Sequence, residues 1–265
     1  MEFETLINSL TESYYKKYPS MKRIPTTIIL SENITQTHCE LRTDLRERLL
    51  NDVSQNDNND CNGRIVLPSS IDEPIYILLN TQKIIQYTKD KTMTWIGTFA
   101  HELTHAIDYY IMARKENLIS YDVLQEIKLY EMFQLWSEYH ARKLGYRFLR
   151  HFFLEAGELV NPESDIRYIK EIEWPHHLDI HYKEYHNPLT SGNHQRYITM
   201  QLLGRYSVWC DIYPESFNIE SISETFSGDA WMVNLFRFLY NHETLDKIYP
   251  CFEEMHRVFE ENWPM

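Results

Sequence analysis

Apolar residues in the first eighty positions change from helical spacing to short continuous runs. Residues 2–18 carry apolar side chains three and four apart and end before Pro19, which predicts a helix. Three short runs rich in β-branched residues, 26–30, 64–67 and 75–79, predict strands. We expect these strands to form a small mixed sheet with an edge to which an extended peptide could add. A short helix is expected at 40–50, and the very polar segment 51–63 is expected to be a surface loop.

The rest of the chain has mainly helical spacing. Helices are predicted at 94–112, 121–153, 194–213 and 228–262, whereas 154–189 is interrupted by glycine and prolines. This interruption is the expected domain boundary. The predicted fold class is therefore α+β, with a domain of residues 1–155 that contains the sheet and a helical C-terminal subdomain of residues 156–265.

The predicted helix 94–112 contains the pattern His-Glu-Leu-Thr-His. At 100° per residue, His101, His105 and Asp108 share one stripe, and the opposite side is strongly apolar. Two histidines four residues apart can bind one metal ion, and Glu102 lies where its carboxylate can take a proton from a metal-bound water. The alternative is a chance match in which both histidines make ordinary hydrogen bonds. The apolar opposite face favours metal binding, because polar side chains on a buried helix are unfavourable unless they bind a partner or an ion.

A catalytic zinc ion usually has three protein ligands, so a third must come from elsewhere. Glu138 is the first choice, because it shares a stripe of the next predicted helix with two small residues, Ala141 and Gly145, that would permit close approach of another helix. Glu131 is the main competitor, Glu126 a more distant one. Asp108 could orient a ligand imidazole as a hydrogen-bond acceptor, or be a plain surface carboxylate.

Hydrolysis also needs a donor for the developing oxyanion. The interrupted segment is rich in side chains of the required type, and the pattern does not choose among them or separate them from ordinary loop residues. They are His176, His177, His181, His186, Tyr182 and Tyr185.

Composition limits the binding partners and the cellular compartment that we expect for this chain. The net charge of −13 and the pI near 5.4 disfavour binding to nucleic acid or to an anionic membrane. No basic and apolar leader opens the sequence, and no run of 18 apolar residues occurs. The four cysteines lie far apart without a Cys-x-x-Cys pair, which is typical of reduced thiols, and a Cys39–Cys61 bridge is not expected. We therefore expect a cytoplasmic protein.

Two segments resemble a known enzyme family. His101 to Ala106, HELTHA, looks like the active-site helix of zincin metallopeptidases and is identical over six residues to that of thermolysin-like enzymes. The segment 137–141, SEYHA, resembles the Glu-x-x-Ala segment of gluzincins, most closely the ImmA/IrrE-like group of cytoplasmic peptidases. The resemblance covers about residues 75–153. It implies a zincin-like fold, one Zn²⁺ per chain with His101, His105 and Glu138 as ligands, and Glu102 as general base.

The expected function is thus hydrolysis of peptide bonds in a protein or peptide substrate by a zinc-activated water. The alternative is a non-catalytic regulatory or interaction protein that keeps the zincin fold and its zinc. Glu102 disfavours this alternative, because a purely structural zinc site needs no base and is usually closed by a fourth side chain. A helical interaction protein with a chance motif would contain no metal.

Overall fold

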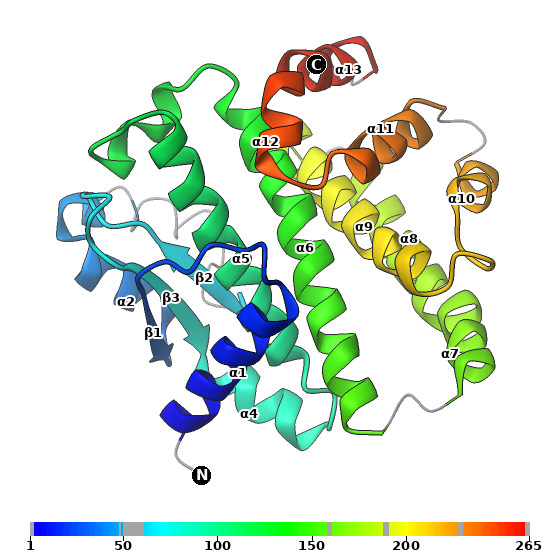
Figure 1. Cartoon of the computed structure of the whole chain (residues 1–265), viewed down its shortest axis with the longest axis horizontal. Helices are drawn as coiled ribbons and strands as arrows, with labels where there is room; N and C mark the ends of the chain where they lie inside the picture. Colours follow the sequence, from blue (N-terminus) through cyan, green and yellow to red (C-terminus); the bar gives the residue numbers. More distant parts are fainter. Residues whose placement is uncertain are drawn as a thin grey trace. The chain divides into compact units, whose positions relative to one another are not determined.

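The computed structural model describes residues 3–47, 49, 61–157, 161–187, 191–226 and 230–262. They form two compact units, 1–125 and 126–265, whose elements are drawn in Figure 1. The chain is of the predicted α+β class, with a small mixed sheet and many helices. The predicted division at residues 155 and 156 stays a prediction. Among the described helices, none has both the length and the apolarity to cross a membrane.

The first unit contains the sheet. Its elements in chain order are α1 (Phe3–Lys17), β1 (Thr26–Ser31), α2 (Ile34–Leu41), η1 (Thr43–Leu45), β2 (Gly63–Val66), β3 (Ile75–Asn80), α4 (Thr81–Lys89), α5 (Thr94–Lys115) and η3 (Tyr121–Glu126). The helix predicted at 2–18 and the three strands predicted before residue 80 are all present. The short helix predicted at 40–50 overlaps the end of α2 and η1, and part of it falls outside the described residues. Most of the polar segment 51–63 falls outside the described residues. Helix α4 was not predicted; Asn80 caps it by accepting hydrogen bonds from the backbone N–H groups of Gln82 and Lys83.

Within the described residues, strand β3 is the centre of the sheet, with order β1-β3-β2. It pairs in parallel with β1 and antiparallel with β2. Helix α2 covers one face, where Ile34, Val66 and Leu78 form a buried cluster. Helix α5 packs on β2 and β3 from the other face. Because both faces are covered, β3 is a continuous apolar run instead of an alternating one.

The second unit is helical. Its elements are α6 (Tyr130–Glu155), α7 (Pro162–Tyr168), the π-helical turn η4 (Ile169–Glu173), α8 (Trp174–Tyr185), α9 (Gly192–Ile212), α10 (Ile219–Thr225), α11 (Ala230–Asn241), α12 (Leu245–Ile248), η5 (Tyr249–Cys251) and α13 (Phe252–Asn262). The predicted helix 121–153 is divided, because Leu129 adopts a left-handed backbone with φ 63° between η3 and α6.

The segment 154–189, expected to be irregular, is helical over most of its described part. Asn161 caps α7, and the chain then continues without a break through η4 into α8. The wider π turn lies just before Pro175, at the place where this proline removes one helical hydrogen bond and would crowd the carbonyl four residues earlier. The proline therefore coincides with a local change of helix type and does not end the helix.

Helices α6 and α9 pack tightly at Gly204. A Cβ added to this glycine would lie 2.6 Å from the backbone oxygen of Tyr139 and 3.0 Å from the Cβ of Arg142. Only a residue without a side chain fits there, so Gly204 sets the separation of the two helices.

We expect Gly204→Ala to lower the free energy of unfolding by about 1–3 kcal/mol, because a backbone oxygen cannot move aside without shifting a helix. Chemical unfolding by urea measures this loss. Gly192→Ala in the same helix is the matched control, since a Cβ there meets nothing within 4 Å; it should leave stability unchanged or raise it by about 0.5–1 kcal/mol. Equal stability of the two variants would contradict the close packing.

Candidate metal-binding site on helix α5

Helix α5 is fixed in the first unit by its apolar side. Phe99, Leu103 and Ala106 on that side are fully buried. Helix α1 runs beside α5, with the ring of Phe3 near that of Trp95 at 6.1 Å. The hydroxyl of Tyr14 is 2.7 Å from that of Thr104 and forms a buried hydrogen bond with it. These contacts set the rotation of α5 about its axis, and thereby where its histidines point.

The imidazole rings of His101 and His105 converge. Their Nε2 atoms lie 3.1 Å apart, and the two ring planes are perpendicular. Two histidine nitrogens bound to one tetrahedral zinc, each at about 2.0–2.1 Å, would be separated by about 3.3 Å. A direct N–H···N hydrogen bond between the rings fits the same distance but needs a proton on one Nε2, whereas a metal needs both nitrogens unprotonated. The two histidines therefore share one face of α5 as predicted, and the distance between their Nε2 atoms is compatible with two ligands of one metal ion.

Glu102 is buried next to this pair, with 8% of its surface exposed. Its side chain passes the start of β2: a Cβ added to Gly63 would lie 3.1 Å from the Cγ of Glu102 and 2.9 Å from the Cγ2 of Thr98. Strand β2 pairs only with β3 among the described strands, and the face of its first residue, Gly63, lies against Glu102. Gly63 was not predicted as part of the site; its only signal in the sequence is a glycine directly before a predicted strand in a chain with few glycines.

The three carboxylates considered as a third ligand differ in their surroundings. Glu138 in α6 is buried, with 4% of its surface exposed, and its Oε1 lies 3.9 Å from a guanidinium nitrogen of Arg142. Glu131 is half-exposed and forms an ion pair of 2.6 Å with Arg196. Glu126 is exposed. Only Glu138 among the three is a buried carboxylate, which is the expected state of a metal ligand and an unfavourable one for a carboxylate without a cation.

Asp108 is also buried, with 2% of its surface exposed. Burial raises the pKa of Tyr14 well above its usual value, and the nearby charge of Asp108 raises it further. Asp108 is therefore a buried carboxylate whose charge acts on Tyr14, and it is not a plain surface carboxylate. That it orients a ligand imidazole stays a prediction.

The histidines and tyrosines proposed as oxyanion donors belong to α8 or follow it directly. His176, His186 and Tyr182 are exposed. The Nε2 of His181 lies 2.9 Å from the hydroxyl of Thr199 in α9, and His177 is held near Glu173 at 3.8 Å. The second unit thus uses these two histidines within its own packing. No residue of this group is singled out as an oxyanion donor.

Comparisons with protein-family models, with curated proteins and with solved structures found no match. The assignment of this site therefore rests on its own residues and geometry.

We expect Gly63→Ala to lower stability by about 1–3 kcal/mol, because the new methyl group meets the side chains of Thr98 and Glu102 at less than contact distance. Urea unfolding measures the loss. Thr98→Ser removes the closer of these atoms, Cγ2, so the double variant should recover part of the loss, whereas Thr98→Ser alone should cost less than about 1 kcal/mol. Full stability of Gly63→Ala would show that β2 does not lie against Glu102.

Proposed function

We propose that this protein is a zinc-dependent peptidase, with His101, His105 and Glu138 as zinc ligands and Glu102 as general base. The observation that carries the proposal is the convergence of the two Nε2 atoms to 3.1 Å on α5, with the buried carboxylate of Glu102 next to them in the chain. A buried and a half-buried imidazole with an adjacent buried carboxylate have a clear chemical use, whereas a packing role alone would not require them.

The donor set suits zinc. Two imidazoles and one carboxylate are a common set in catalytic zinc sites, and the fourth position stays open for water or substrate. His101 and Glu138 are buried and His105 is half-buried, so each of the three is at least partly shielded from water. The burial of Glu138, in contrast to the exposure of Glu131 and Glu126, supports it as the third ligand.

A zinc ion held there would polarise a peptide carbonyl and lower the pKa of water to about 7. Glu102 would accept the proton of the attacking water at its carboxylate and pass it to the leaving amine. The edge of β2 that has no partner among the described strands could hold an extended peptide by main-chain hydrogen bonds. Specificity would then depend on side chains along that edge.

The alternative is a regulatory or interaction protein that binds zinc without catalysis. Such a protein would share the ligands but would have no use for the proton acceptor. Because both functions share the zinc ligands, zinc binding and catalysis are measured separately.

The first prediction concerns metal content, measured by plasma mass spectrometry on protein prepared without a metal-affinity tag. Wild-type protein should contain nearly one zinc ion per chain. His105→Ala and Glu138→Ala should lose most of it, because each removes one of three protein ligands. Glu131→Ala is the matched control in the same helix and should retain zinc, since Glu131 is engaged by Arg196. Wild-type protein that stays free of zinc after zinc is added would contradict the proposal.

The second prediction concerns catalysis, measured with a mixture of quenched-fluorescent peptides. Glu102→Gln should retain zinc and fold normally but cleave at least about 100-fold more slowly, because the amide cannot accept the proton. Equal cleavage by wild type and Glu102→Gln would exclude Glu102 as base. A wild type that contains zinc and cleaves none of the peptides would favour the non-catalytic alternative.

A further inference from the structure

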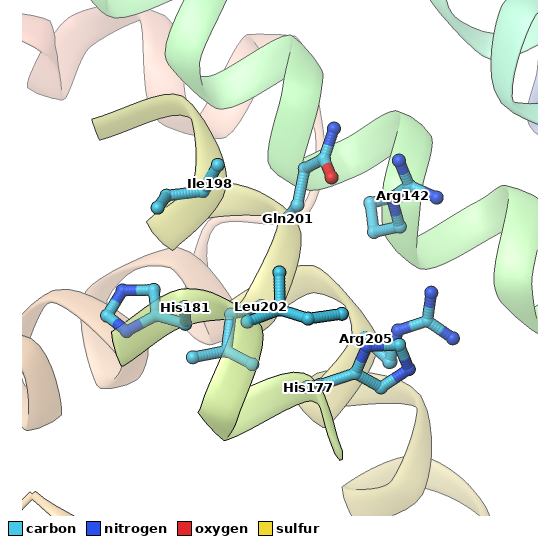
Figure 2. A pocket seen from close by; sticks show the side chains of 8 residues that line it. Arg142, His177, His181, Ile198, Gln201, Leu202 and Arg205 are labelled. Carbon is cyan, nitrogen blue, oxygen red and sulfur yellow. The ribbon is translucent and has the colours of Figure 1, made fainter. Parts of the chain in front are cut away.

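The second unit contains a small pocket that the proposed peptidase chemistry does not use. It lies between α6, α8 and α9 and has a volume of about 80 Å³, enough for a compact group of a few atoms. Figure 2 shows Arg142, Gln201, Arg205 and His177 around one side of it, with Ile198 and His181 on the other. The pocket therefore has a polar, cationic side and a side that includes aliphatic surface.

Two arginines dominate the cationic side. The close approach of α9 to α6 at Gly204 brings the next residue, Arg205, into the neighbourhood of Arg142. Burial lowers the pKa of Arg205, and the charge of Arg142 lowers it further. None of the lining side chains is a carboxylate. Two guanidinium groups thus face one small space with no anion in the lining to neutralise them.

The surroundings hold these groups in place without using all their donors. Arg205 stacks over the ring of Tyr146 at 4.4 Å and contacts Glu173 at 3.3 Å. Arg142 has only a long contact of 3.9 Å with Glu138, and its buried Nε has no hydrogen-bond partner among the described residues. Such a donor favours a ligand that can accept its hydrogen.

The other polar side chains of the lining are His177, His181 and Gln201. Burial lowers the pKa of His177, although its hydrogen bond to Glu173 acts in the opposite direction. The imidazole is then uncharged at pH 7, and Gln201 adds an amide. The net charge offered to a ligand therefore comes from the two arginines, each of which already has a carboxylate in its neighbourhood. This favours a singly charged ligand over a doubly charged one.

Aliphatic side chains complete the pocket: Ile180, Ile198 and Leu202. A ligand with a charged head alone would leave this surface in water, whereas a short hydrocarbon tail would cover it.

We propose that this pocket binds a small aliphatic carboxylate, with its carboxylate between Arg142 and Arg205 and its hydrocarbon tail against Ile180, Ile198 and Leu202. Arginine matches a carboxylate well because its planar fork can donate two parallel hydrogen bonds. None of the proposed zinc ligands lines the pocket.

The test is calorimetric titration of the full chain with three probes of matched design. 3-Methylbutanoate has both the charge and the tail, 3-methylbutanamide has the tail without the charge, and inorganic phosphate has charge without a tail. Wild-type protein should bind the carboxylate at least about tenfold more tightly than either of the other two, because loss of a charged hydrogen bond or of the buried tail each weakens binding by about this factor.

Two variants locate the site. Arg142→Gln should weaken binding of 3-methylbutanoate at least tenfold, and Ile198→Trp should do the same by filling the aliphatic side, which keeps the test valid if one variant does not fold. Arg147→Gln is the matched control, because Arg147 lies in α6 but pairs with Asp211 at 3.2 Å and does not line the pocket. It should bind as wild type does.

Other outcomes overturn the proposal. Absence of 3-methylbutanoate binding in folded wild-type protein would show that the pocket is not a carboxylate site. Phosphate that binds as tightly as 3-methylbutanoate would indicate a general oxyanion site in which the aliphatic wall has no role. Unchanged binding in both Arg142→Gln and Ile198→Trp would place the carboxylate elsewhere on the chain.

Discussion

Helix α5 can present two imidazoles and a carboxylate at one place because its rotation is fixed from two sides. Its apolar side packs on the sheet. Helix α1 lies along α5 and is joined to it by the buried hydrogen bond between Tyr14 and Thr104. The separation of β2 from α5 is set by Gly63, where even a methyl group would meet Glu102. The geometry of the histidine pair and the burial of Glu102 follow from this packing.

The second unit is organised around buried polar groups as much as around its apolar core. The hydroxyl of Tyr146 donates to Glu173 at 2.7 Å and accepts hydrogen bonds from Arg150 and from the indole of Trp209. Arg150 also pairs with Asp165. Groups of this kind usually stay buried only when they have hydrogen-bond partners, so they fix the relative positions of α6, α7, η4 and α9. Arg205, which lines the pocket between α6, α8 and α9, contacts this network at Tyr146 and Glu173.

The charge of the chain and the charge of its pocket have opposite signs. The net charge is −13, yet Arg142 and Arg205 face a small space with no carboxylate in its lining. A bulk charge describes the long-range field, which salt screens over about 8–10 Å, whereas binding depends on groups within a few ångströms. The composition of this chain therefore could not predict an anion site.

Local sequence patterns were sufficient to predict most of the helices and strands. Apolar periodicity predicted α1, α5 and α9, the β-branched runs predicted all three strands, and the spacing of His101 and His105 predicted that they share a face. Spacing could not predict that the chain continues as helix past Pro175, because a proline ordinarily ends a helix and the π turn before it leaves no periodic signal. Nor could it separate Glu138 from Glu131, which lie on one stripe. Packing alone buries the first and pairs the second with Arg196, 65 residues away in sequence, and such distant contacts leave no periodic signal.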